Sequence, residues 1–199
     1  QYKKVLASGV LDCIAITDHN RIDLAQKLQE ELGSDKIIVG EEIATSEGEI
    51  IGLYLSSPIL PNQSLEATIE AVRKQGGIVY IPHPFETVRK GISPQALERI
   101  RSSIDILESA NGRALLQNKG PQAHTWARLH NIPTFASSDA HRAKALGKTF
   151  TMLEALPTRE TLLQLLQKAK KTYQRPSIGD VLAPKRAKIV KVLRRQKNA

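Results

Sequence analysis

The sequence predicts an α/β protein whose largely parallel sheet curls into a barrel or a distorted barrel. Short apolar runs that end in polar residues alternate along the chain with segments of helical apolar spacing. Strands that alternate with helices form parallel sheets through right-handed crossovers, and six or seven such units favour a barrel over an open sheet. No Gly-x-Gly-x-x-Gly follows a predicted strand, and no Gly-x-x-x-x-Gly-Lys-Ser/Thr is present. Dinucleotide-binding and P-loop folds therefore lack their phosphate cradle.

The first half of the chain contains helical and strand-like segments in alternation. A glycine follows each helical segment (Gly9, Gly33 and Gly76), as is common after helix C-termini, and Ser64 is a typical N-cap. The predicted helices cover 1–8, 23–32 and 64–75, and the predicted strands cover 14–16, 37–39 and 49–55.

The second half continues the alternation. Pro94 and Pro121 each stand where a helix can begin, because proline is tolerated in the first turn. The predicted strands cover 78–81, 104–107 (ending at Glu108), 133–136 and 148–152. The predicted helices cover 94–102, 121–129, the strongly amphipathic 158–169, and 183–195.

Length and composition fit one globular domain over residues 1–199. No apolar run approaches the ~20 residues that a membrane span needs, so we expect a soluble protein without a membrane partner. The single cysteine, Cys13, lies inside the first strand-like run, which excludes an intrachain disulfide and favours a buried apolar environment over a ligand role. Without a cysteine framework or a signal peptide, a cytoplasmic location is favoured.

Basic residues are concentrated at the C-terminal end of the chain. The net charge is +9, and Pro184–Ala199 contains seven Lys or Arg residues and no acid. Ile189, Val190 and Leu193 stand at helical spacing, which predicts a basic C-terminal helix over 184–199. Two interpretations remain open: a solvated basic face, or a surface that attracts an anionic substrate or RNA.

Four strand-like runs end in groups of polar residues. Ligands and catalytic groups of α/β folds gather at the carboxyl ends of parallel strands. Imidazole and carboxylate groups are the ligands of Zn²⁺, Mn²⁺ or Fe²⁺. We therefore expect a metal site along one edge of the sheet, built from Thr17-Asp18-His19, Glu41-Glu42, Pro82-His83-Pro84 and Ser137-Ser138-Asp139-Ala140-His141.

These four motifs together resemble, in order and spacing, the motifs of the PHP (polymerase and histidinol phosphatase) family. The resemblance covers nearly the whole chain and is greatest with the small stand-alone phosphoesterases. It implies a distorted seven-stranded βα barrel. It also implies two or three divalent metal ions (Mn, Zn or Fe, with Mg an alternative) at the strand C-termini, and hydrolysis of phosphate esters.

Carried over residue by residue, the resemblance makes five side chains metal ligands: His19, Glu42, His83, Asp139 and His141. Glu42 would bridge two metals. Asp18 would either ligate or orient a ligand. The family often has a histidine where this chain has Glu49. Glu49 is then either an oxygen ligand in its place or a solvent-facing strand residue.

The front of the chain departs from the family pattern. The family's first motif, His-x-His on the first strand followed by an Asp, has no counterpart here, and Gln1–Ser8 resembles the helix that comes after it. Either residues that carry the first strand precede Gln1, or the chain is a degenerate member with fewer metals. We favour the first alternative because the remaining ligand positions are filled.

Positive side chains near the predicted metals are candidates for binding phosphate. Arg89 follows His83-Pro84 in a turn-rich loop, and we favour a substrate phosphate as its partner. Arg142, which follows His141, and Lys90 are equally well explained as surface charges. Asn111-Gly112-Arg113, after Glu108, resembles the family's segment at the end of another barrel strand. The resemblance implies that Asn111 lines the pocket, with Glu108 as its support.

Two classes of function follow. The first is a metal-dependent phosphoesterase that hydrolyses a phosphomonoester, a nucleotide or an oligonucleotide end with metal-activated water. Asp18, His19, Glu42, Asp139 and His141 would form its catalytic centre. The second is a degenerate PHP-like module that binds nucleic acid or a partner through the basic C-terminal helix. The low aromatic content, 4%, argues against a stacking platform for single strands.

Overall fold

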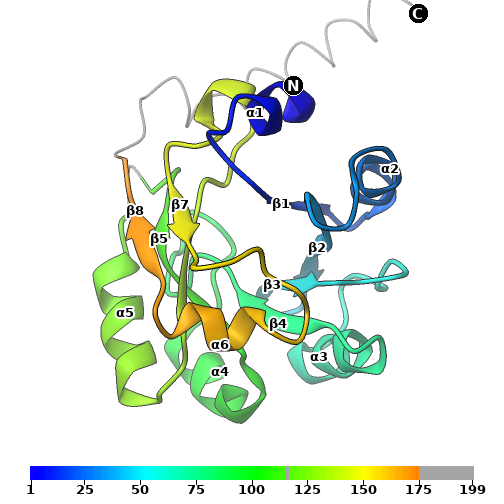
Figure 1. Cartoon of the computed structure of the whole chain (residues 1–199). Helices are drawn as coiled ribbons and strands as arrows, with labels where there is room; N and C mark the ends of the chain where they lie inside the picture. The colour runs from blue at the N-terminus through cyan, green and yellow to red at the C-terminus, as the bar shows by residue number, and fades with distance from the viewer. Residues whose placement is uncertain (115–116, 175–199) are drawn as a thin grey trace, which may run out of the picture.

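The computed structural model describes residues 1–114 and 117–174. Its main feature is a six-stranded sheet in which the strands are hydrogen-bonded in chain order. The sheet curls, and Figure 1 shows its strands following a curved path with helices along the outer side. The six strands are β1 (Ile14–His19), β2 (Ile37–Thr45), β3 (Gly48–Leu53), β4 (Ile78–Ile81), β5 (Ile106–Asn111) and β6 (Thr134–Ser137). The predicted α/β class is confirmed. The described sheet has six strands, and the seven strands that the resemblance implies stay a prediction.

The sheet is mixed rather than parallel throughout. β1 pairs parallel with β2, and β4, β5 and β6 pair parallel with one another, but β3 runs antiparallel to both of its neighbours. The prediction of a parallel strand at 49–55 is therefore wrong. Only two residues separate β2 from β3, which suits a hairpin and leaves no room for a crossover helix. The hairpin brings the end of β2 and the start of β3 to one edge of the sheet.

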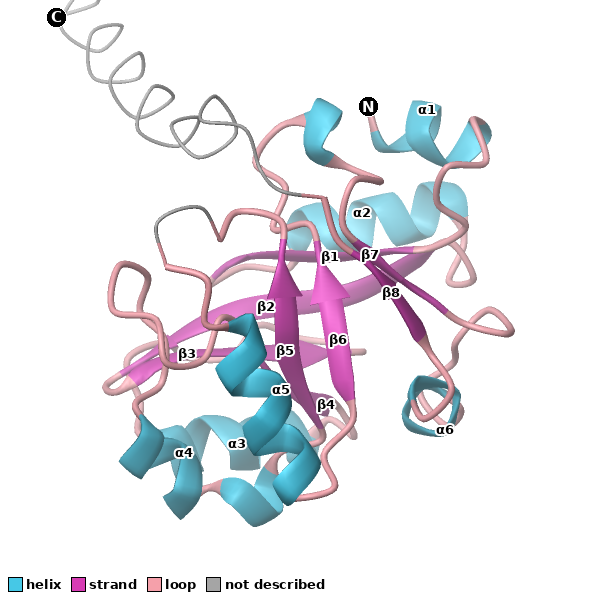
Figure 2. Ribbon diagram, turned by 90° about the vertical axis from the view of Figure 1, so that its left-hand side faces the viewer, coloured by secondary structure: helices cyan, strands magenta, loops and turns pink. Residues whose placement is uncertain are grey.

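Helices cover the sheet unequally. α2 packs against β1 and β2, whereas α3, α4 and α5 pack against the outer face of the rest of the sheet. α6 packs against the inner, concave face, and Figure 2 shows it on the opposite side from α3, α4 and α5. The helices are α1 (Tyr2–Ala7), α2 (Asp23–Leu32), α3 (Leu65–Lys74), α4 (Pro94–Arg99), α5 (Gly120–Leu129) and α6 (Leu162–Leu166), with short 3₁₀ turns η1 (Arg101–Ser103) and η2 (Ala143–Ala145).

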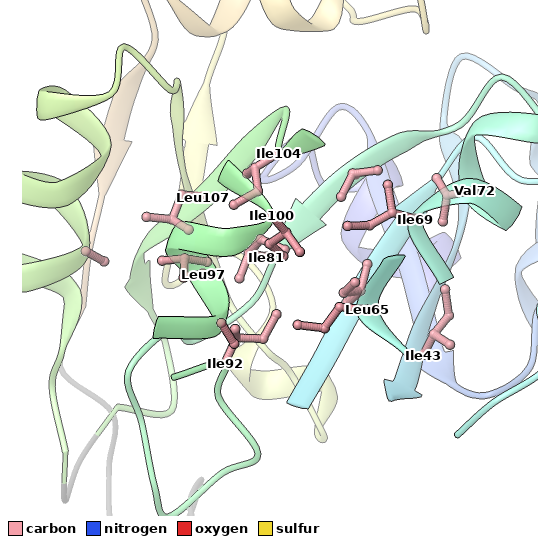
Figure 3. Close-up of a cluster of buried hydrophobic side chains, with 14 of the residues drawn as sticks. Ile43, Leu65, Ile69, Val72, Ile81, Ile92, Leu97, Ile100, Ile104 and Leu107 are labelled. Carbon is pink, nitrogen blue, oxygen red and sulfur yellow. The ribbon is translucent and has the colours of Figure 1, made fainter. Parts of the chain in front are cut away.

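The largest core lies between the outer face of the sheet and α3, α4 and α5. Figure 3 shows the aliphatic side chains that meet there, among them Leu65 from α3, Ile81 from β4 and Leu97 from α4, all fully buried. α3 presents this apolar face because its N-terminus is fixed: the Ser64 hydroxyl accepts a hydrogen bond from the Ala67 amide at 3.1 Å. This core holds the outer half of the fold together, and the concave face is left to carry the site.

Several predicted limits change in the structure. β2 continues through Glu41 and Glu42 to Thr45, and β5 continues past Glu108 to Asn111, so these acids lie within strands instead of after them. The expected strand over 148–152 is the three-residue β7 (Phe150–Met152).

The end of the described chain also differs. The helix predicted over 158–169 is reduced to α6, because residues 158–161 and 167–169 lie outside the helix. β8 (Lys170–Thr172) follows directly and pairs with β7 in a separate two-stranded sheet. The predicted basic helix over 184–199 lies outside the described residues. No helix within residues 1–114 and 117–174 combines the length and the apolarity needed to cross a membrane.

Leu65→Ala should destabilise the protein by about 2–5 kcal/mol, because truncating a fully buried leucine in a packed core loses its contacts and leaves a cavity. Leu60→Ala is the matched control. Leu60 is 70% exposed, so its loss should change stability by no more than about 0.5 kcal/mol. Urea unfolding followed by circular dichroism measures both. Equal effects of the two changes would contradict the packing described here.

Candidate metal centre

The concave face of the sheet is apolar at one end and acidic at the other. Side chains alternate along each strand, so residues that share a face are two apart. On β2, Ile38 and Glu42 share the concave face, and on β3 Ile51 and Glu49 do. On β1, His19 lies on the concave face, because Ile14 and Ile16 pack outward against α2. The polar residues thus gather at the edge where β1 and β2 end and β3 begins.

Three of these side chains could hold a metal ion. Ligand atoms of His19, Glu42 and Glu49 all lie within 4.8 Å of one another, and this is the one group of its kind among the described residues. His19 Nδ1 lies 3.5 Å from Glu42 Oε2 and 3.8 Å from Glu49 Oε1. His83 completes the group from the loop after β4, with its Nε2 3.1 Å from Glu42 Oε1 and 3.6 Å from Glu49 Oε2. We call these four residues the His/Glu cluster.

The chemistry of the cluster fits a divalent cation. Two carboxylates converge, and the ion-pair partners of both within the described residues are the two histidines. Burial, together with the adjacent negative charge of Glu42, raises the pKa of Glu49. Burial would lower the pKa of His83, but its contact with Glu42 and the charge of Glu108 raise it instead. A cation would relieve the repulsion between the two glutamates, and imidazole with carboxylate is a common ligand set.

Glu49 belongs to this cluster, and its burial excludes one of its two predicted environments. It is 9% exposed and faces the concave side, so it is not a solvent-facing strand residue. The register of the β2–β3 hairpin pairs Glu49 with Ala44, two residues from Glu42 on the same face. Glu41, by contrast, points to the opposite face. It is fully buried there, and its Oε2 accepts a hydrogen bond from the Ile59 amide at 2.8 Å.

Asp139 and His141, also predicted as ligands, lie beside the cluster and have different partners. Asp139 Oδ2 accepts from Arg89 Nη1 at 2.6 Å, and Asp139 Oδ1 lies 3.2 Å from Arg113 Nη1. Burial would raise the pKa of Asp139, but the two guanidinium groups outweigh it and lower the pKa. His141 Nδ1 lies 3.4 Å from Asp139 Oδ1. The structure thus divides the predicted ligands into the His/Glu cluster and an arginine-paired carboxylate.

Glu108 accepts hydrogen bonds from residues that lie between these two parts of the site. It is 2% exposed, and both of its carboxylate oxygens accept two hydrogen bonds. Oε1 accepts from the hydroxyls of Tyr80, at 2.7 Å, and Ser137. Oε2 accepts from the His83 amide at 2.7 Å and from Asn111 Nδ2 at 2.8 Å. Burial raises the pKa of Glu108. Its four donors come from β4, β5, β6 and the loop that carries His83.

The backbone is strained where the predicted ligands stand. His83 and Asp139 have φ values of 30° and 45°, and Asn20, just after His19, has 52°. Residues other than glycine seldom adopt positive φ, and such strain persists where the surroundings enforce it, often at functional sites. Asn20 shows one such constraint, since its Oδ1 accepts from the Ala44 amide at 2.9 Å and ties the end of β1 to β2.

The remaining predicted residues lie around the same site. Asp18 belongs to the face of β1 opposite to His19, by strand alternation. Asn111 is buried, and its Oδ1 accepts from Arg89 Nη1 at 2.8 Å. Arg142 is half-buried and lines a cavity of about 960 Å³. The cavity runs along the concave face and is lined both by apolar residues of the sheet and by residues of the candidate site, including His19, Glu42, His83, Asp139 and His141.

Sequence reasoning assigned no role to four residues that shape the site. Tyr80 and Ser137 hold Glu108, Glu86 pairs with Arg89, and Arg113 contacts Asp139. Glu86 precedes Arg89 by three residues, a spacing that could have signalled the pair. Ser137 and Arg113 stand in segments that resemble family motifs, whereas nothing in the local sequence distinguishes Tyr80, because its partner is distant in the chain.

The comparisons with known proteins agree with this geometry. A family model described as PHP-associated matches residues 120–170. The chain is 33% identical over 118 residues to the uncharacterised protein MJ1587 of Methanocaldococcus jannaschii, over 58% of this chain and 68% of that one. It is 32% identical over 146 residues to MJ0417 of the same organism, over 71% of this chain and 58% of that one.

A solved structure shares the fold. It is a two-domain protein from Bacteroides vulgatus that contains a predicted PHP-like metal-dependent phosphoesterase. It matches with a TM-score of 0.62 and 22% identity, over 87% of this chain and 59% of that one. The chain combines an α/β fold and a curled sheet with acidic and imidazole groups at one sheet edge. Together with these matches, these features define the class of protein. The chain belongs to the PHP family.

Glu108→Gln should lower the free energy of unfolding by about 1–3 kcal/mol. The replacement amide keeps the shape of the side chain, but whichever way it turns, its NH₂ group faces donors where an oxygen accepted two hydrogen bonds. Glu30→Gln, on the exposed face of α2, is the control and should have little effect. Urea unfolding measures both, and an unchanged midpoint for Glu108→Gln would contradict the assigned hydrogen bonds.

Metal binding at the His/Glu cluster should strengthen as pH rises. The pKa values of Glu49 and His83 are both raised, so protons occupy these ligands to higher pH than in free side chains. A metal must displace those protons, and each proton displaced contributes up to about a tenfold gain in affinity per pH unit. Titration with Mn²⁺ at about pH 6 and about pH 8 should therefore show clearly tighter binding at the higher pH. An affinity that is the same at both would exclude these residues as ligands.

Proposed function

We propose that the protein is a metal-dependent phosphoesterase that hydrolyses a phosphomonoester, a nucleotide or an oligonucleotide end. One observation carries the proposal: two carboxylates and two imidazoles converge, and three of them (His19, Glu42 and His83) line a large cavity. No Lys or Arg among the described residues forms an ion pair with those carboxylates. The B. vulgatus structure, which contains a predicted PHP-like metal-dependent phosphoesterase, supports the same class of reaction.

Different residues of the chain would bind the metal ions and the substrate. His19, Glu42, Glu49 and His83 would hold the first metal ion, with Asp139 and His141 contributing to a second or third. Divalent ions there (Mn, Zn or Fe) would lower the pKa of bound water and neutralise charge on a phosphoryl group. His83 is fixed because its buried backbone amide donates a hydrogen bond to Glu108, and Glu42 is fixed by its place inside β2. Ligands fixed in this way need little rearrangement to bind.

The substrate would enter the concave cavity. Its apolar part, which includes Ile51, Tyr80 and Phe135, suits the non-phosphorylated part of a small molecule or nucleotide. Arg142, which lines the cavity, and the positive net charge of the chain would attract the phosphate. The alternative function, a degenerate module that binds nucleic acid through 184–199, depends on residues outside the described part of the chain and predicts no metal-dependent turnover.

Glu42→Ala should abolish most metal-dependent hydrolysis of a generic phosphomonoester. Losing a ligand should cost more than the roughly 100-fold that losing an outer-shell partner of a metal site can cost. Glu70→Ala, an exposed glutamate on α3, is the matched control and should turn over like the wild type. Both variants are assayed with Mn²⁺, alongside elemental analysis and circular dichroism. Wild-type turnover by a folded Glu42→Ala variant, or no metal-dependent turnover by the wild type, would overturn the proposal.

A further inference from the structure

Charge is distributed unevenly along the chain. Residues 1–108 contain 11 Lys or Arg and 16 Asp or Glu, whereas residues 109–174 contain 10 Lys or Arg and three Asp or Glu. Two stretches of the second part, 109–138 and 161–174, contain no acidic residue, and each contains three Lys or Arg. Such a separation of charge is a feature of surfaces that meet a polyanion, and the fold itself does not require it.

The fold brings these two acid-free stretches together at Lys171 of β8. Its Nζ donates hydrogen bonds to Ser109 Oγ on β5, at 3.2 Å, and to Thr134 Oγ1 on β6. Burial lowers the pKa of Lys171, and no neighbouring carboxylate offsets that effect. An ammonium group has three N–H donors, so one remains for an anion after the two hydroxyls are satisfied.

Helix α5 adds cationic groups beside Lys171. His124 and Arg128 are exposed and stand one helical turn apart, at i and i+4. Burial lowers the pKa of His124, and the positive charges of Lys171 and Arg128 lower it further, so these three side chains lie within electrostatic reach of one another. No acidic residue contributes to that shift. We call His124, Arg128 and Lys171 the basic face.

An aromatic side chain continues the basic face along β8. Tyr173 comes two residues after Lys171, and residues two apart in an extended segment share a side. Its side chain is 41% exposed. Surfaces that bind single-stranded nucleic acid combine positive charge along the backbone with aromatic rings on which bases stack. A protein partner would instead favour an apolar centre from which charged residues are depleted.

We propose that the basic face binds the phosphodiester backbone of a single-stranded nucleic acid and that Tyr173 stacks on one of its bases. Lys171 and Arg128 each contact a phosphate, so binding does not depend on base sequence. The inference does not rest on the proposed function, because it needs neither the His/Glu cluster nor turnover. It also differs from binding through 184–199, since all of its residues belong to the described fold.

The first test measures binding of a labelled single-stranded oligonucleotide to the full chain by fluorescence anisotropy, in EDTA so that no metal-dependent cleavage occurs. Arg128→Glu/Lys171→Glu should weaken binding at least about tenfold at about 0.1 M salt. Each phosphate contact that is lost should also reduce the slope of log K against log salt by about 0.7.

Lys27→Glu/Lys74→Glu is the matched control, because it changes the net charge equally at exposed positions of α2 and α3. Its binding should stay within about threefold of the wild type, since charges more than about 10 Å from the bound strand are screened. Equal losses in the two double variants would overturn the inference, because overall charge would then explain the binding.

Arg128→Glu alone serves if the double variant does not fold. Arg128 is exposed on α5, so this change should leave the circular dichroism spectrum unchanged and weaken binding several-fold. Wild-type affinity in this variant would also overturn the inference.

A second test identifies the class of partner. Tyr173→Ala should weaken oligonucleotide binding at least about fivefold at an unchanged salt slope, because a stacked base contributes to affinity without releasing a counterion. Polyglutamate of equal charge has no bases, so it should bind more weakly and respond little to Tyr173→Ala. Polyglutamate binding as tight as that of the oligonucleotide would overturn the assignment to nucleic acid and favour an acidic protein.

Discussion

The buried carboxylate of Glu108 constrains the site more than any other single group. An ionised carboxylate in the interior is costly unless hydrogen bonds satisfy it, and here four donors do so. Those donors come from separate strands and from the loop that follows β4, so their positions are fixed relative to one another. The amide of His83 is one of them, and Asn111 is another. Asn111 in turn is hydrogen-bonded to Arg89 and Asp139, so these residues and Glu108 form one connected hydrogen-bond network.

The charges in this network are compensated unevenly. On one side, Asp139 pairs with two arginines; on the other, the ion-pair partners of Glu42 and Glu49 within the described residues are histidines. Lys90 acts on Glu49 only through its charge, without forming an ion pair. A metal ion would supply the missing positive charge there. The arginine side offers hydrogen-bond donors that suit an anion. The two halves of the site thus favour ligands of opposite charge, as the proposed phosphoesterase function requires.

Much of the fold could be predicted because local patterns decide it. The limits of α2 and β4 match their predictions residue for residue, since apolar spacing, a following glycine and flanking polar residues mark them. The antiparallel β3 could not be predicted from its apolar run, which is the same for either direction. The hairpin also decides that Glu49 faces inward. Arg113 contacts Asp139, which is 26 residues away in the chain, and three of the four donors to Glu108 are 25 to 29 residues away. A local sequence pattern does not reveal such contacts.

Asp139 shows why a motif alone does not determine the state of a residue. The Ser-Ser-Asp-Ala-His motif places a carboxylate at the end of β6, where a metal ligand is expected. The fold also brings Arg89 and Arg113 to that carboxylate from positions 50 and 26 residues away in sequence. Metal and guanidinium groups attract the same two oxygens, so occupancy of one partner lowers the availability of the other. A metal ion held as proposed would therefore compete with Arg89 and Arg113 for the oxygens of this one carboxylate, whose contacts in the structure are with the arginines.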